Sequence, residues 1–243
     1  MSFFGRCLAR VLQTNVCVSR FAVGVVAVYA LNDEFKSILG ETKNGMVSAL
    51  SYVLAKTVLV IPIMFVFSLF ATGIPMFAIQ DFPAEAFGIA VTLWACLIYV
   101  FECAAEALAV WFEDPILGML QFMNLWFASF LFAGFLIPLR DMYWPLKIFY
   151  YTMPYQYYVR SILYTWFSNS TFEPCLEGSI GAVCENTSDG KEVLEGLSKI
   201  FPLISSENRV AEDIGILIAI AAFYKIVSIA GIMMKSRKVA SIH

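Results

Sequence analysis

Long apolar stretches separated by short polar segments run through most of the 243 residues. Residues 57–80 and 117–137 contain no charged side chain, and a helix needs about 20 apolar residues to cross a bilayer core. Such stretches are expected to be helical, because a backbone in lipid must satisfy its own hydrogen bonds. The pattern predicts five membrane-spanning helices, at 20–38, 53–74, 86–112, 117–137 and 212–234.

Composition points to the same class of protein. Hydrophobic residues make up 60% of the chain and charged residues 14%, whereas a soluble domain has about 25% charged residues. We therefore expect an all-α membrane protein, a polytopic helical bundle of about five transmembrane helices. The net charge of −3 does not indicate nucleic-acid binding. The one histidine, His243, argues against a metal or acid–base site built from histidines.

The two ends of the chain flank the predicted bundle. Arg6, Arg10 and Arg20 interrupt the N-terminal region, which therefore does not resemble a cleaved signal peptide. We expect residues 1–19 to be an external segment or a remnant of a longer chain. At the other end the basic run KSRK, 235–238, indicates the cytoplasmic side, with 239–243 as a cytoplasmic tail.

Residues 168–210 are then expected to form an external loop. This stretch holds two glycosylation sequons, at Asn169 and Asn186. It also holds Cys175 and Cys184, which an oxidising compartment would allow to form a disulfide. Sequons also arise by chance, and the two cysteines could be free. Counting spans back from 210 places residues 40–56 in the cytoplasm and the start of the chain outside, which suggests a missing span upstream.

Residues 138–167 form a segment of mixed character beside the fourth predicted span. Pro138, Pro145 and Pro154 break any continuous helix, and the segment is dense in Tyr and Trp, which favour the headgroup layer. Arg140, Lys147 and Arg160 could reach lipid phosphates. The segment is expected to be a re-entrant hairpin, or alternatively a single interfacial helix.

Three motifs in order resemble one transporter family. They are ETKNGMVSALSYVLAKTVLVIP (41–62), FAGFLIPLRDMYWPLKIFYYTMPYQYYVRSILYTWF (132–167) and SDGKEVLEGLSKIF (188–201). Together they resemble the ABC-2-type transmembrane domain of the ABC transporter G subfamily, the subfamily of pleiotropic-drug-resistance-like transporters. The resemblance runs from about Val16 to Lys238 and implies a transmembrane domain over 20–238. That family's domain has six spans, so the first span here matches the family's second.

The chain departs from the complete family pattern in one respect. It contains no G-x-x-x-x-G-K-[ST] phosphate loop, and its one Gly-Lys pair, Gly190-Lys191, is followed by Glu192. The chain alone is therefore not expected to be an enzyme or to bind a cofactor. The resemblance implies that ATP and Mg are bound by a nucleotide-binding domain, either upstream or on a separate chain, and that a second transmembrane domain completes a dimer.

The resemblance also implies a role for the polar connection before the second predicted span. In the family this connection contacts the nucleotide-binding domain and carries its motion to the spans. The residues that would do so are Glu41, Lys43, Asn44, Gly45 and Ser48. An ordinary solvated loop is the alternative interpretation.

The fourth predicted span carries candidate substrate-binding residues. Met123, Phe127 and Phe130 share roughly one helix face, and Phe122 lies beside it. The resemblance implies a central cavity for apolar substrates, which Met and aromatic side chains would suit. Packing in the core or against lipid is the alternative.

Glu102 and Glu106 lie one turn apart inside the third predicted span. A charge at this depth costs a few kcal/mol or more, so both side chains are expected to face the bundle interior. They could form a polar relay that helps the helices switch. Alternatively, they pair with Lys56 or Lys225 and hold the bundle together.

The function implied is the transmembrane part of an ATP-driven exporter of lipids, sterols or hydrophobic xenobiotics. It would be a multi-pass protein of the plasma membrane or another endomembrane. The alternative is a non-transporting scaffold or regulator of complete transporters. An ion channel is less favoured, because no ring of charges or filter-like run is present.

Overall fold

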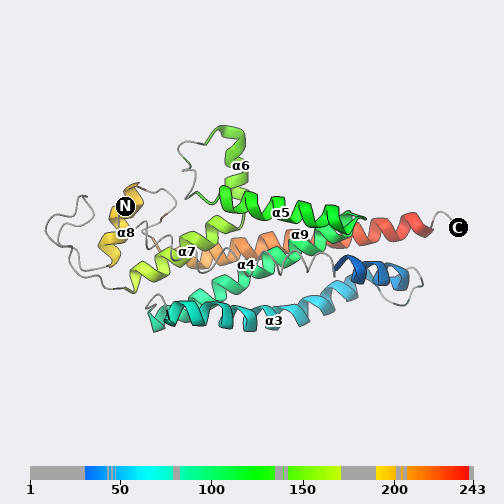
Figure 1. The fold of residues 1–243 in the computed structure, drawn as a ribbon, viewed down its shortest axis with the longest axis horizontal. Helices are drawn as coiled ribbons and strands as arrows, with labels where there is room; N and C mark the ends of the chain where they lie inside the picture. Colours follow the sequence, from blue (N-terminus) through cyan, green and yellow to red (C-terminus); the bar gives the residue numbers. More distant parts are fainter. Residues whose placement is uncertain are drawn as a thin grey trace. The chain divides into compact units, whose positions relative to one another are not determined.

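The computed structural model describes residues 31–42, 44, 46, 48–78, 83–134, 139, 142–170, 190–200, 204 and 207–240. In these ranges the chain consists of helices joined by short turns and contains no strand. A helical segment at 31–42 comes first. It is followed by α3 (Ala49–Ala78), α4 (Ala84–Trp111), α5 (Pro115–Leu131), α6 (Trp144–Thr152), α7 (Tyr155–Ser168), α8 (Gly190–Ile200) and α9 (Val210–Ala240) (Figure 1). The predicted all-helical fold is confirmed.

Three of these helices are long and apolar enough to cross a membrane. They contain the stretches Ala49–Gly73, Ala84–Trp111 and Val210–Ser236, with mean hydropathies of 2.3, 1.9 and 2.2. These stretches overlap the predicted spans at 53–74, 86–112 and 212–234. Apolar length alone was enough to find them, because a bilayer leaves a chain few alternatives to a helix.

The helix α5 is shorter than the sequence predicts. The uncharged stretch at 117–137 suggested one long span, but α5 begins at Pro115 and ends at Leu131. Asp114 starts the helix, because its Oδ1 accepts a hydrogen bond from the Ile116 N–H at 2.9 Å. Beyond Leu131 the chain turns, and Gly134 takes a left-handed conformation with φ 88°, which ordinary residues adopt at a cost. Gly134 was the available signal for this turn, because a glycine in this conformation commonly follows the end of a helix.

The first predicted span, 20–38, is only partly covered by the structure. Residues 20–30 lie outside the described residues, and the helix that begins at 31 continues past 38 to 42. The predicted external loop likewise contains a helix, α8.

The described chain divides into two compact units. Unit 1 combines 1–69, 98–126 and 218–243, and unit 2 combines 70–97 and 127–217.

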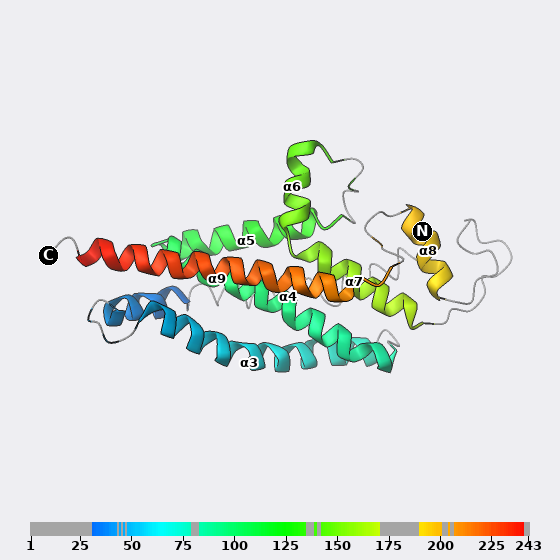
Figure 2. The same ribbon diagram turned by 180° about the vertical axis from the view of Figure 1, so that it is seen from behind.

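In unit 1 the segment at 31–42 packs beside the beginning of α3, as Figure 2 shows. Its Phe35 is buried with Val53, Val110 and Ile232, which belong to α3, α4 and α9. The backbone of α9 approaches α4 closely at Gly231, where a Cβ atom would lie 2.5 Å from Cγ1 of Val110. The segment at 31–42 is therefore held against the bundle by apolar packing from three helices.

In unit 2 the predicted hairpin forms two helices, α6 and α7, with contrasting burial. Most of α7 is buried: the ring of Tyr158 lies 5.2 Å from that of Trp94. In α6, by contrast, only Tyr150 is buried, and Trp144 is 77% exposed. Pro145 and Pro154 lie at the starts of α6 and α7, positions where a missing N–H is tolerated. The chain therefore forms two helices here and not a single interfacial one.

Candidate functional site

Unit 1 contains a group of charged and polar side chains that we call the charge cluster: Glu34, Tyr52, Lys56, Glu106 and Lys225. They come from four helices: the segment at 31–42, α3, α4 and α9. Tyr52 and Lys56 are four residues apart in α3 and so lie on the same face. The cluster brings together residues up to 191 positions apart in a stretch of chain built mostly of apolar side chains.

The members of the charge cluster form one continuous polar chain. Lys225 Nζ donates a hydrogen bond to Glu106 Oε2. Lys56 Nζ lies 3.9 Å from Glu106 Oε1 and donates to Glu34 Oε2 at 2.7 Å. Tyr52 OH donates to Glu34 Oε1 at 2.7 Å and accepts from Lys56 Nζ at 3.1 Å. A path of ion pairs and hydrogen bonds thus runs from α9 through α4 and α3 to the segment at 31–42.

The inner part of the charge cluster is shielded from solvent. The side chains of Glu106, Lys225 and Lys56 are 8%, 11% and 13% exposed. Lys225 Nζ also lies 5.8 Å from the centre of the Tyr99 ring, within range of a cation–π interaction. Removing one partner from a buried ion pair costs about 3–5 kcal/mol, because the other charge is left buried alone. Glu106 and Lys225, the two most buried members, therefore depend on each other.

The sequence identified part of this cluster. The pairing of Glu106 with Lys56 and Lys225, expected as the alternative to a relay, is present in the structure. Glu102, one turn earlier, is half-buried and makes no hydrogen bond or ion pair within the described part of the chain. Glu34 and Tyr52 were not predicted. A charge at position 34 inside a predicted span was the available signal for Glu34.

The residues predicted to couple to a nucleotide-binding domain lie next to the charge cluster along the chain. Glu41 is exposed at the end of the helix that carries Glu34, and Asn44 and Ser48 are also exposed. Ser48 caps α3, because its Oγ accepts the Ser51 N–H at 3.1 Å. Lys43 and Gly45 lie outside the described residues.

The predicted cavity residues of α5 have different surroundings in the two units. In unit 1, Phe122 is buried and its ring lies 6.4 Å from that of Phe101, edge-on, while Met123 is half-buried. In unit 2, the ring of Phe130 packs 5.9 Å from that of Tyr155, and Phe127 is 55% exposed. Phe127 is thus the most accessible of the four to a lipid or an apolar ligand.

Of the four residues predicted for glycosylation or a disulfide, only Asn169 lies in the described part of the chain. It is exposed directly after α7, and its Nδ2 donates to the Thr165 carbonyl at 2.8 Å. Cys175, Cys184 and Asn186 lie outside the described residues.

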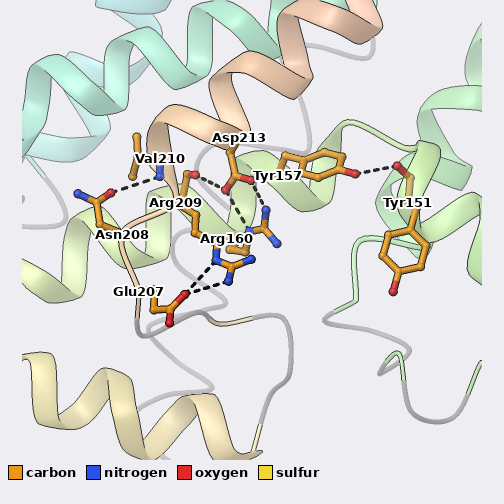
Figure 3. Close-up of polar contacts among 9 residues, drawn as sticks. Tyr151, Tyr157, Arg160, Glu207, Asn208, Arg209, Val210 and Asp213 are labelled. Carbon is orange, nitrogen blue, oxygen red and sulfur yellow. Dashed lines mark hydrogen bonds and ion pairs between the residues drawn. The ribbon is translucent and has the colours of Figure 1, made fainter.

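Unit 2 contains a largely buried ion pair between Arg160 of α7 and Asp213 in the first turn of α9. Figure 3 shows the two side chains facing each other. Arg160 donates through Nε to Asp213 Oδ2 at 3.0 Å and through Nη2 to Oδ1. Ser161 Oγ donates to Oδ2 at 2.5 Å, and the Tyr157 ring centre lies 5.5 Å from the guanidinium carbon. Asp213 has no exposed surface.

This geometry corrects one prediction. Arg160 was expected to reach lipid phosphates, but both ends of its guanidinium fork are occupied by Asp213. The hydrogen bonds with that carboxylate raise the pKa of Arg160 above its ordinary value. Asp213 is 53 residues away in sequence, so no local pattern could have indicated the pair. It attaches α7 to the first turn of α9.

The fold and these ion pairs define a helical membrane protein in which the buried charged residues of the described chain, Glu106, Lys225 and Asp213, are all paired. Comparison with known proteins identifies the family: the model of the ABC-2 family transporter protein matches residues 17–230. The chain belongs to this family, and the resemblance seen in the sequence is confirmed.

A curated relative agrees with this assignment. The chain is 26% identical over 209 residues to ABC transporter G family member 23 of Arabidopsis thaliana. The alignment covers 84% of this chain but 31% of the relative, so the chain spans less than a third of that protein's length. The chain is a transporter membrane component.

Proposed function

We propose that this chain is the transmembrane part of an ATP-driven exporter of lipids, sterols or hydrophobic xenobiotics. The observation that carries the proposal is the family match over 17–230, nearly the whole chain. The name of the relative, an ABC transporter, supports ATP as the energy source. ATP and Mg would be bound by a nucleotide-binding domain, upstream or on a separate chain, and a second transmembrane domain would complete the transporter.

The charge cluster supplies a physical route for coupling in this proposal. Glu34 lies on the same helix as the exposed Glu41. A partner domain that moved the Glu41 end would displace Glu34, and with it Lys56, Glu106 and Lys225. Because breaking a buried pair is costly, the helices would move between arrangements that keep the charges paired. This is the relay interpretation, now with named contacts.

The position of the cluster along α3 and α4 fits an orientation in which residues 40–48 face the cytoplasm. Lys56 lies seven residues after Ala49, about 10 Å along α3, and Glu106 lies five residues before Trp111, about 8 Å along α4. The polar connection at 40–48 and the KSRK run are proposed to face the cytoplasm. The cluster would then occupy the cytoplasmic half of a multi-pass protein in the plasma membrane or another endomembrane.

The test is reconstitution of the chain with its nucleotide-binding domain in liposomes. The measurement is ATP-dependent movement of a fluorescent phospholipid, a sterol analogue and an apolar dye. Glu41→Ala should reduce transport while substrate binding persists, whereas Lys36→Ala, an exposed change on the same helix, should have little effect.

Three outcomes would argue against the proposal. Unchanged transport in Glu41→Ala would contradict the coupling role. A wild-type assembly that moves none of the probes with ATP would contradict the exporter. If that assembly altered transport by a separate complete transporter, the regulator would be favoured.

A further inference from the structure

Asn32 is a buried polar residue that the sequence did not single out. It lies in the segment at 31–42, one turn before the core residue Phe35, and is 2% exposed. A buried amide costs free energy unless its polar atoms are hydrogen-bonded. Its contacts therefore need a physical explanation.

The partners of Asn32 are carbonyl groups at the end of α4. Its Nδ2 lies 3.1 Å from the Phe112 carbonyl oxygen and 3.4 Å from that of Ala109. Carbonyls at the end of a helix lack partners within that helix. The Phe112 N–H is already bonded to Leu108 O at 3.0 Å. Asn32 thus supplies, from another segment, donors that the end of α4 lacks.

Stability alone does not account for an asparagine at this position. Its Oδ1 is buried and has no hydrogen-bond partner among the described residues. An unsatisfied buried acceptor costs free energy, which offsets much of what the two Nδ2 contacts contribute. A leucine of similar size would avoid this cost. What the asparagine adds is a pair of directional hydrogen bonds that join the segment at 31–42 to the backbone of α4.

The segment at 31–42 has a second attachment two residues further on. Glu34 accepts hydrogen bonds from Tyr52 and Lys56 of α3. Residues two apart on a helix point to different sides, so Asn32 connects the segment to α4 and Glu34 connects it to α3. Together they fix the orientation of the segment at two points.

We propose that Asn32 is a positioning residue that makes the segment at 31–42 and the C-terminal end of α4 move as one body. Glu41 lies nine residues further along the same helix, about 14 Å away. A displacement at Glu41 reaches the backbone of α4 through Asn32, separately from the side-chain path of the charge cluster. The source of this displacement rests on the proposed function. The rigid connection between the segment at 31–42 and α4 does not depend on it.

The test measures distances in the full transporter, reconstituted in lipid nanodiscs. Spin labels are placed at Ser37→Cys and Glu113→Cys, both exposed and in unit 1, after the six native cysteines are replaced. Electron paramagnetic resonance should give one narrow distance distribution, with and without ATP. Asn32→Leu should broaden it while the thermal unfolding midpoint stays near that of the unsubstituted protein. Transport per ATP hydrolysed should fall about five-fold or more.

Two variants complete the design. Asn32→Asp keeps the shape but removes the donor, so it should also broaden the distribution. Asp33→Leu is the control, because Asp33 is exposed and its ion pair with Lys36, at 3.9 Å, joins two exposed side chains of the same helix. Distributions in Asn32→Leu and Asn32→Asp as narrow as in the unsubstituted protein would overturn the proposal, since apolar packing of Phe35 would then suffice. If the unsubstituted protein transports nothing, the proposed function fails, but the distances still decide the role of Asn32.

Discussion

Lys225 of α9 donates a hydrogen bond to Glu106 of α4, and both side chains are buried. The two residues are 119 positions apart in the chain. Each lies in a helix long and apolar enough to cross a membrane. Neither charge could remain alone at this depth without a cost of several kcal/mol. The pair therefore fixes which faces of α4 and α9 meet in unit 1.

The first prediction concerns this pair. Glu106→Gln leaves the buried ammonium group of Lys225 without its carboxylate, and should lower the free energy of unfolding by about 3–5 kcal/mol. The double variant Glu106→Leu with Lys225→Leu removes both charges, while Lys56 keeps Glu34. It should be more stable than Glu106→Gln. Thermal unfolding in detergent checks both. Glu102→Gln, one turn away, is the matched control, and an equal loss there would contradict the prediction.

The second prediction concerns Arg160 and Asp213 in unit 2. Asp213→Asn keeps the shape of the side chain but leaves a half-buried guanidinium without its carboxylate, so stability should fall by about 3 kcal/mol or more. Arg160→Lys should have a smaller effect, because a lysine keeps the charge but cannot make the two-pronged contact. Thermal unfolding is the measurement.

A control for the second prediction lies nearby. Glu207 and Arg209 form an exposed ion pair at 2.9 Å, and exposed pairs contribute little to stability because both ions stay solvated. Arg209→Lys should therefore leave the unfolding midpoint almost unchanged. The prediction is wrong if Asp213→Asn is no more destabilising than this control.

The sequence predicted the spanning helices better than the contacts between them. Apolar length identified the stretches within α3, α4 and α9, because lipid forces a helical backbone. The end of α5 was missed, because it depends on the backbone turn at Gly134. Local spacing identified Glu102 and Glu106, and Lys56 and Lys225 were the cations expected to pair with them. Asn32 and Asp213 were missed because their partners are 77 and 53 residues away.

The third prediction concerns the close approach of α9 to α4 at Gly231. A Cβ atom there would lie 2.5 Å from Val110 Cγ1 and 3.1 Å from Trp111 Nε1. Gly231→Ala should push the two helices apart and destabilise the protein by about 1–3 kcal/mol. It should also disturb the hydrogen bond from Trp111 Nε1 to the Val227 carbonyl, which is 3.3 Å long. A shift in tryptophan fluorescence would report this change.

The matched control for the third prediction is Gly215→Ala in the same helix. A Cβ atom at Gly215 would meet nothing within 4 Å, and alanine is the better helix former by about 1 kcal/mol. Gly215→Ala should therefore be neutral or stabilising. Equal unfolding midpoints for the two variants would show that α4 and α9 can separate at Gly231 without loss.

The fourth prediction separates the stabilising role of the charge cluster from a role in coupling. Tyr52→Phe removes one hydroxyl that donates to Glu34 at 2.7 Å and accepts from Lys56 at 3.1 Å. The ion pair between Glu34 and Lys56 remains, so the free energy of unfolding should fall by only about 1 kcal/mol. If the cluster transmits movement from the segment at 31–42, transport per ATP should fall more than this small loss of stability explains.

Tyr151→Phe is the control, because Tyr151 is 59% exposed and takes part in its hydrogen bond with Tyr157 through its backbone carbonyl. Equal transport per ATP in the two variants would leave the cluster with a structural role alone.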